Sequence, residues 1–526
     1  MNLRQVSHSR TGFSCRLAVA SLLLLVCLPL TSALAQEYGG VVHAAMTTEP
    51  PELDPYVGGS AATRNIGHHV FEGLVTYDET YALMPQLAES WEISDDGLTY
   101  TFHLRPDVQF HDGSSLDAED VVASLERFRD IGYRTRDFEL VTDFAAADEG
   151  TVVITLSEAE GAFLSKLANP GVLIGIMPSE QAASREALRP PNLIGTGPYR
   201  IEEWRPGEYV RLVRFDEFSP SPLPASGLGG EKVAYFDEVW FHPVAEPGTR
   251  VAGLETGEYH FAEGIPTTSL DRIESSSDLV AHLVKPKWKL ALNFNHRESF
   301  FSDVTARRAL LAALDMEEVL GVVTSGREEF YRAQPGLFFN EQRTWHTTVG
   351  GGVYNNQDQD LARQLFQEAG YNGQELVMAT NRDFEWMYRA ALAIQAQLSE
   401  VGVTLRLDVH DWAAQRDKTK QPSGWDLGSD GKSMRLDPND YNTAFLCESS
   451  SSFGYCSQEM DELVLTGARE PDVAARQEIY SELQRMMWEE LPWLPMGDLF
   501  ELEATNASVT GYQNWYTPRF WNVSFE

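Results

Sequence analysis

The feature that most constrains this chain is an ordered run of strand, turn and helix signals over residues 71–128. Residues 98–105 alternate between apolar and polar side chains, which predicts a strand with one buried face. The Asp-Asp-Gly sequence at 95–97 is a turn signal. Asp117 and Asp120 are typical of a helix N-terminus, and apolar residues at helical spacing follow them. This run therefore predicts a strand and a helix that pack on one core.

Helix and strand patterns alternate in the second half of the chain. Helices are predicted over 360–369 and 386–401, each followed by a glycine that can end it, and strands over 376–380 and 403–409. Such succession favours an α/β fold with a mostly parallel sheet. One long helix is also predicted over 303–323.

The N-terminus has the pattern of a secretory signal. Three arginines precede an apolar stretch at 17–30, which is too short to span a bilayer, and Ala-Leu-Ala at 33–35 is a cleavage signal. The pattern predicts a signal peptide over residues 1–35, cleavage before Gln36 and a periplasmic protein. Cys27 follows a bulky residue, which disfavours lipoprotein processing.

Charge and length exclude several classes of protein. The formal net charge of -37 argues against nucleic-acid binding, which needs a basic surface, and favours a solubility adaptation. The 526 residues are enough for two or three subdomains.

Two cysteines remain once the predicted signal peptide is removed. Cys447 and Cys456 are an even pair, and in an oxidising compartment they are predicted to form one disulfide. No second Cys or His pair completes a metal site near them, so neither a metal nor a cofactor is predicted.

Several sequence blocks identify a family resemblance. FEGLV, LAESW, DDGLTYTFHLRPDVQFHDG and AEDVVASLERF follow one another within 71–128, with LDP at 53–55 before them and GTGPYR at 195–200 after them. In this order they resemble the family 5 extracellular solute-binding proteins, which include the periplasmic dipeptide, oligopeptide and nickel receptors of ABC importers. The resemblance implies a two-lobed α/β periplasmic binding protein fold of type II, in the large peptide-binding class.

The same resemblance implies how the chain is divided. Lobe 1 is expected to comprise residues 36–75, 188–287 and 491–526, with an extra subdomain at 76–187, and lobe 2 residues 288–490. The expected partners are a small-molecule or peptide ligand, which closes the lobes, and an ABC permease in the inner membrane. The protein is expected to be a monomer.

The resemblance also places candidate ligand contacts between the lobes. The loop after the LDP block is expected to face the ligand. So are the chain crossover near 288, the start of the helix predicted over 386–401 and the segment after the strand predicted over 403–409. The residues so singled out are Tyr56, Gly59, Trp288, Lys289, Trp386 and Trp412.

The segment at 425–441 carries the expectation about cargo. In peptide-binding members an aspartate about three residues before a D-P turn holds the peptide amino group, whereas this chain has Met434 or Arg435 there. Lys432 and Arg435 favour an anionic or neutral polar solute, although residues three apart on a regular strand cannot both face a cavity. Asp430 could still supply a carboxylate if the loop is shifted, and solvated loop charges are the plainer alternative.

Other functions stay open at this point. Within the family, an opine, a sugar derivative or a metal chelate are alternative cargoes. From another class, Ser429 and Lys432 fit the S-x-x-K pattern of serine hydrolases, but no partner motif accompanies them, so no enzyme is expected.

Overall fold

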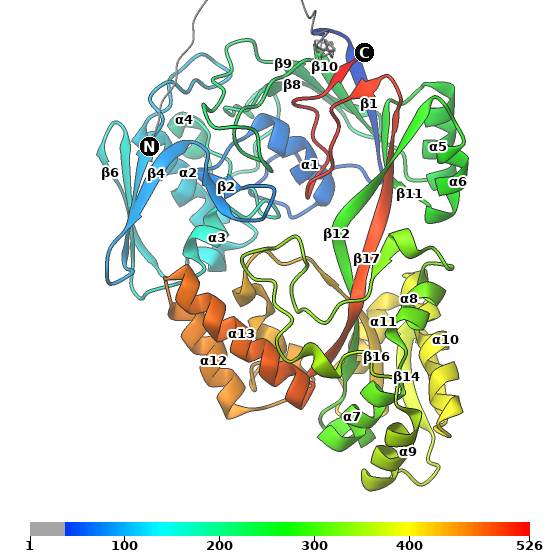
Figure 1. The fold of residues 1–526 in the computed structure, drawn as a ribbon. Coiled ribbons are helices and arrows are strands. Elements are labelled where there is room, and N and C mark those ends of the chain that lie inside the picture. Colours follow the sequence, from blue (N-terminus) through cyan, green and yellow to red (C-terminus); the bar gives the residue numbers. More distant parts are fainter. Residues whose placement is uncertain (1–36) are drawn as a thin grey trace, which may run out of the picture. The chain divides into compact units, whose positions relative to one another are not determined.

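One large sheet organises residues 37–526, which are the residues that the computed structural model describes; the predicted signal peptide lies outside them. The sheet has eleven strands in the order β15–β14–β16–β12–β17–β11–β1–β10–β9–β8, with β13 also paired to β17 (Figure 1). The strands are β1 (Val41–Met46), β8 (Tyr199–Arg205), β9 (Tyr209–Arg214), β10 (Glu238–Pro243), β11 (Phe261–Ile265), β12 (Leu279–Phe294), β13 (Tyr331–Arg332), β14 (Leu376–Asn381), β15 (Leu405–His410), β16 (Leu427–Ser433) and β17 (Trp493–Asn506).

Two parallel groups of strands lie within this sheet. β1 pairs in parallel with β10 and β11, and β14 pairs in parallel with β15 and β16. We call the first group with its attached elements the first lobe, and the second group with its helices the second lobe. The α/β class predicted from the alternating patterns is confirmed. The prediction of a mostly parallel sheet holds only for these two groups, because the other strand pairs of the large sheet are antiparallel.

The long strands β12 and β17 join the two lobes. They pair antiparallel from Leu279 opposite Asn506 to Asn293 opposite Trp493, and Figure 1 shows them running from one strand group to the other. Their register shifts between Val284 and Trp288. Residues 285–287 therefore leave the regular ladder at the junction of the lobes.

Helices cover the strands of both lobes. They are α1 (Ala61–Val70), α5 (Pro247–Thr256) and α6 (Leu270–Glu274) in the first lobe, and α7 (Val304–Ala313), α8 (Met316–Val323), α9 (Gln359–Glu368), α10 (Glu385–Glu400), α11 (Trp412–Lys420), α12 (Gln458–Arg469) and α13 (Val473–Glu490) in the second. The prediction of one helix over 303–323 is wrong. The chain leaves the helix at Leu314, and the side chain of Asp315 then accepts a hydrogen bond from the Glu318 N–H to begin α8.

A smaller antiparallel sheet holds the opening run of signals. Its order is β4–β5–β7–β6, and α2 packs on β6 and β7. The elements of this region are β2 (Val75–Tyr77), β3 (Leu83–Pro85), β4 (Ala88–Ile93), β5 (Thr99–Leu104), α2 (Ala118–Ile131), β6 (Val141–Asp148), β7 (Thr151–Leu156), α3 (Phe163–Leu167) and α4 (Ser179–Ala182). Asp117 and Asp120 form a reciprocal capping box on α2, as their spacing predicts.

A buried ion pair ties this region to the start of the chain. Arg127 on α2 donates to both carboxylate oxygens of Asp54, at 3.2 and 2.5 Å, and both side chains are fully buried. Asp54 also accepts backbone N–H bonds from Tyr56 and Leu188. The aspartate of the LDP block thus has a structural role: it neutralises a guanidinium inside the first lobe.

Two main hydrophobic cores result. The larger includes side chains of the small sheet and of the first lobe, together with Trp515 and Trp521 near the C-terminus. The other fills the second lobe between its strands and helices.

The exact lobe boundaries given above stay a prediction. Within residues 37–526, no helix is long and apolar enough to cross a membrane. A short hairpin of β18 (Val509–Thr510) and β19 (Ser524–Phe525) completes the described elements.

The predicted disulfide is present. Cys447 and Cys456 are bonded, and they are nine residues apart in sequence. Replacing both with serine is expected to lower the free energy of unfolding of the second lobe by about 2–3 kcal/mol. The effect is modest because the disulfide closes a short loop, which removes little conformational entropy from the unfolded chain. Urea denaturation of the variant and the parent would measure this. Two alkylatable thiols in the non-reduced protein would contradict the pairing.

Candidate functional site

A cavity of about 490 Å³ lies where the lobes meet, beside the interrupted part of β12. We call it the central cavity. Its walls come from the ends of β1, β11 and β16, from the middle of β12 and β17, and from loops of both lobes. The lining residues that bear on its chemistry are Gly59, Arg64, Asn65, Tyr133, Arg134, Glu263, Lys287, Trp288, Met434, Arg435, Asp440, Glu501, Glu503, Asn514 and Tyr516.

Four of the predicted ligand contacts line this cavity: Gly59, Trp288, Met434 and Arg435. A Cβ atom on Gly59 would lie 2.9 Å from the ring of Tyr133, so glycine keeps this wall open. The Trp288 indole N–H donates to Glu501 at 2.8 Å, which fixes the ring at the cavity wall. These four residues therefore remain candidate ligand contacts, now placed at one cavity.

Tyr56 does not line the cavity, and this part of the expectation is corrected. Its side chain is fully buried, its hydroxyl donates to the Gly175 carbonyl at 2.7 Å, and the Arg127 guanidinium lies 5.0 Å from its ring centroid. The Asp54–Arg127 ion pair turns this part of the loop into the first-lobe core.

Lys289 is also turned away from the cavity. Adjacent residues of a strand point to opposite faces, so Trp288 and Lys289 cannot both face a ligand. The Lys289 ammonium lies 2.5 Å from the Asp498 carboxylate, and both side chains are fully buried. Burial lowers the pKa of Lys289, and the aspartate opposes that shift. This lysine is part of the second-lobe interior.

Asp430 and Lys432 bind each other. They are two apart on β16 and therefore lie on one face, where the ammonium is 2.8 Å from the carboxylate. Burial opposes the charge of Asp430, but Lys432 outweighs it and the pKa of Asp430 is lowered. Neither side chain lines the central cavity. The expectation that Lys432 meets a ligand anion is corrected by this pairing.

The two tryptophans of the second lobe lie outside the lining of the cavity. Trp386 covers Gly431, where a Cβ would come within 2.2 Å of the indole, and its ring centroid is 6.3 Å from that of Trp288. Trp412 packs edge-on against Phe384, with centroids 5.4 Å apart. Their side chains support the wall rather than form it.

The serine hydrolase pattern has no working geometry. The Ser429 hydroxyl is buried and donates to the Thr380 hydroxyl at 2.9 Å, while Lys432 is paired with Asp430. Within the described part of the chain, no group of three or more His, Cys, Asp or Glu residues could hold a metal ion.

Sequence reasoning missed the cationic side of the cavity. Arg64 on α1, Arg134 after α2 and Arg435 after β16 line it together with Tyr516. Arg134 is paired with Asp137 at 2.9 Å, whereas Arg64 and Arg435 have no ion pair with any residue in 37–526. Arg64 donates to the neutral Gly59 carbonyl, so neither guanidinium charge is paired and both can meet an anionic group of a ligand.

Tyr516 lies among these positive charges. Burial raises the pKa of its hydroxyl, and the charges of Arg64, Lys287 and Arg435 act in the opposite direction. Its hydroxyl therefore stays protonated and can donate to a ligand at neutral pH.

Glu263, Glu501 and Glu503 also line the cavity and were missed as well; we call them the acidic side. Glu263 on β11 accepts hydrogen bonds from Thr47 and Asn65, all of them neutral donors. Glu501 and Glu503 are two apart on β17 and so share a face. Burial alone would lower the pKa of Lys287, but these three carboxylates raise it. The cavity is thus bipolar, because its lining holds both carboxylates and guanidinium groups.

Glu503 is the buried member of this acidic side. Burial raises its pKa to about 7, although the Tyr512 hydroxyl donates to it at 2.7 Å and Asn514 at 2.8 Å. The carboxyl group therefore changes its charge near neutral pH.

This shift predicts a pH dependence of stability. The folded chain keeps the Glu503 proton up to about pH 7, whereas the unfolded chain loses it near the ordinary glutamate pKa of 4.5. Stability is therefore expected to fall between these pH values, by about 3 kcal/mol from this one group. Glu503→Gln keeps the hydrogen bonds and should lack this slope. Denaturation midpoints of both proteins from pH 4.5 to 8 test it, and parallel curves would contradict the shift.

The two-lobed fold with a polar cavity at its junction defines a solute-binding protein of the periplasmic type. The family model of the bacterial extracellular solute-binding proteins, family 5 (middle region), matches residues 82–453, and the chain belongs to this family. It is 28% identical over 492 residues to a probable peptide ABC transporter periplasmic-binding protein of Sinorhizobium fredii, covering 90% of this chain and 91% of that protein. It is 26% identical over 497 residues to a glutathione-binding protein of Pectobacterium atrosepticum, covering 88% and 89%.

Solved structures show the same fold. The ABC transporter substrate-binding protein CtaP of Listeria monocytogenes superposes with a TM-score of 0.82 at 24% identity, covering 93% of this chain and all of that chain. NikA of Brucella suis, solved with Fe(III)-EDTA, gives a TM-score of 0.77 at 19% identity, with 93% and 100% coverage. The relatives are solute-binding proteins rather than enzymes, and the protein is a substrate-binding protein of the kind that serves ABC importers.

Proposed function

We propose that this protein captures a small peptide-like solute with at least two carboxylate groups and one amine, and delivers it to an ABC permease. The observation that carries this proposal is the bipolar central cavity. Arg64 and Arg435, which lack ion-pair partners in residues 37–526, supply two positions for carboxylates. Glu263, which has only neutral donors, is available to an ammonium group on the other side.

Size and relatives support the same class of cargo. A cavity of about 490 Å³ suits a ligand of a few residues, within the usual range of small-molecule sites. Among the relatives are proteins named for binding glutathione, a tripeptide with two carboxylates and one amine. Arg435 stands where an aspartate would hold a peptide amino group, so the amine is assigned to the acidic side instead.

A periplasmic location and a monomeric state are part of the proposal. The N-terminal signal pattern supports the first.

An opine remains a second candidate, since a structural neighbour at 24% identity was solved with agropinic acid. An opine would use the same guanidinium groups.

Calorimetry with a matched set of ligands tests the proposal. The ligands are glutathione, trialanine, the tripeptide Ala-Glu-Ala and its isosteric Ala-Gln-Ala. The two ligands with a second carboxylate should bind at least about 10-fold more tightly than the neutral pair, as expected for one charge-assisted hydrogen bond. Equal affinity for Ala-Glu-Ala and Ala-Gln-Ala would refute the second carboxylate. Tight binding of an amine-free diacid would refute the role of the amine.

A further inference from the structure

A second cavity, of about 640 Å³, lies on the other side of the C-terminal segment from the central cavity. We call it the C-terminal cavity. Asn514 lines both cavities, whereas Trp515 lines only this one and Tyr516 only the central one. Residues 514–516 therefore form a wall between two separate spaces, and the proposed cargo site does not account for the second.

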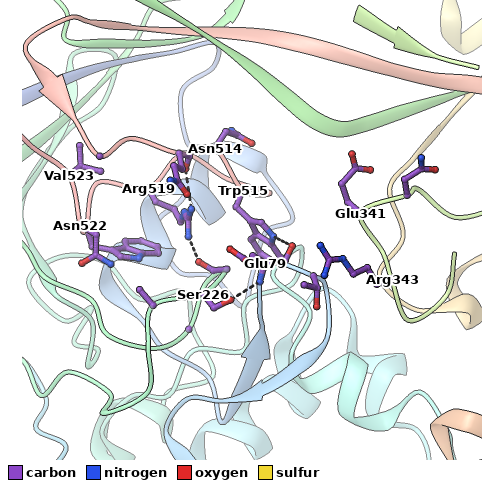
Figure 2. A pocket seen from close by; sticks show the side chains of 17 residues that line it. Glu79, Ser226, Glu341, Arg343, Asn514, Trp515, Arg519, Asn522 and Val523 are labelled. Carbon is purple, nitrogen blue, oxygen red and sulfur yellow. Dashed lines mark hydrogen bonds between the residues drawn. The ribbon is translucent and has the colours of Figure 1, made fainter. Parts of the chain in front are cut away.

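Both lobes contribute to this cavity. The turn between β2 and β3, the loop at 225–229 and the C-terminal segment come from the first lobe, and the loop at 340–343 comes from the second. Figure 2 shows Arg519, Trp515 and Glu79 on one side and Glu341 and Arg343 across the space from them.

Arg519 has no hydrogen-bonded carboxylate within residues 37–526, and Glu79 acts on it only at longer range. Its terminal nitrogens donate to the carbonyl oxygens of Gly227 and Gln513, both neutral, and its Nε is buried with no hydrogen-bond partner. It forms no ion pair with any described residue. Burial lowers its pKa, and an arginine keeps its charge even so. A largely buried cation of this kind is stabilised by an anion that enters the cavity.

Arg343 supplies a second positive charge from the other lobe. It is exposed and has neither a hydrogen bond nor an ion pair from its side chain among residues 37–526. Glu341 beside it is neutralised by Arg332, at 2.8 and 3.1 Å. Glu79 is the other carboxylate of the lining, and it forms no ion pair with any described residue. The lining therefore carries an excess of one positive charge once the Arg332–Glu341 pair is counted as neutral.

Aromatic rings complete the lining. Trp515 stacks on Tyr81 with ring centroids 4.7 Å apart, and its indole N–H donates to the Glu79 carbonyl at 3.2 Å. Trp521 also lines the cavity, and the Lys232 ammonium lies 5.2 Å from its ring centroid. The two indoles are fixed by these contacts, so they offer a rigid apolar surface next to the guanidinium groups.

We propose that the C-terminal cavity is a second ligand site, separate from the cargo site, for a small organic monoanion that combines an acidic group with an apolar ring. The acidic group binds the Arg519 guanidinium, Arg343 adds attraction from the second lobe, and the ring lies against the indoles. Because the ligand contacts both lobes, it stabilises the arrangement in which they face each other.

Titration of the full mature protein with benzoate tests this site, with benzamide as the neutral ligand of the same shape. Benzoate is expected to bind saturably and benzamide at least about 10-fold more weakly, since only the former has the charge. Arg343→Gln should weaken benzoate binding about 5-fold, because it removes one of two cations. Arg469→Gln removes an exposed, unpaired arginine that lines neither cavity, and should leave the affinity unchanged.

Further variants locate the bound anion. Arg519→Lys, which keeps the charge but loses the Nε donor, should also weaken benzoate. Arg435→Ala, in the central cavity, should have no effect. Equal binding of benzamide, or no change in Arg343→Gln, would overturn the proposal. Loss of benzoate binding in Arg435→Ala would also overturn it, by placing the anion in the cargo site.

Discussion

Replacing Arg435 with alanine is expected to raise the Kd for a peptide-like cargo with two carboxylates about 10- to 100-fold, the value of a charge-assisted hydrogen bond in a desolvated site. Arg435 lines the central cavity and has no ion-pair partner within residues 37–526, so its charge is available to the ligand. Calorimetry with Ala-Glu-Ala measures the change. The affinity for trialanine should fall much less, because the second carboxylate is absent.

Two control variants sharpen this test. Lys432→Ala should alter the affinity far less than Arg435→Ala, because Lys432 is committed to Asp430. Arg469→Ala removes an exposed arginine remote from the cavity and corrects for the change in net charge. An unchanged Kd in Arg435→Ala, or a loss that is equally large in Lys432→Ala, would show that the guanidinium does not bind the cargo.

Asp54→Asn is expected to lower the free energy of unfolding of the first lobe by about 3–5 kcal/mol, because it leaves a buried guanidinium without its carboxylate. Arg127 cannot lose its proton to escape this cost. The two side chains are fully buried and doubly hydrogen-bonded, so solvent does not screen the charge that remains. Urea denaturation followed by tryptophan fluorescence measures the loss.

An exposed pair gives the matched control. Asp360 lies 2.7 Å from Arg363, with 97% of the aspartate side chain exposed, and Asp360→Asn should cost less than about 1 kcal/mol. The double variant Asp54→Leu, Arg127→Leu should recover much of the loss, since it removes both charges together. A small effect of Asp54→Asn, similar to that of Asp360→Asn, would contradict the account of the buried pair.

Local patterns predicted the elements well and their boundaries less well. The capping box at Asp117 and Asp120 and the alternating strand that became β5 depend on neighbours in sequence, so they can be read from the sequence. The break between α7 and α8 could not be seen in the same way. Apolar residues continue through Leu314, and the helix ends there because Asp315 caps the next one.

Four of the predicted ligand contacts line the central cavity, and the structure shows why three of the others do not. Trp288 and Lys289 were both proposed as contacts, but strand alternation allows only one to face the cavity. Asp430 and Lys432 share a face, which lets them pair with each other. The burial of Tyr56 depends on its contact with Arg127. Arg127 is distant in sequence, and no local pattern connects the two residues.

The missed residues come from segments far apart in the sequence. Arg64, Glu263 and Tyr516 meet only because the sheet brings α1, β11 and the C-terminal segment together. One signal was present: Glu501 and Glu503 are acidic residues at alternate positions of a strand whose residues are mostly buried. Two carboxylates on one face of a buried strand indicate a polar cavity beside it.

The position of β17 in the sheet has a consequence for how the chain is made. β17 pairs with β11 of the first lobe and with β12, and β12 pairs in turn with β16 of the second lobe. All of these strands precede β17 in the sequence, so β17 is synthesised last. The two halves of the sheet cannot be joined while β17 is still in the ribosome, and pairing of such distant segments is slow in any case. For a chain with the predicted export signal, this order would leave the lobes unjoined during most of its synthesis.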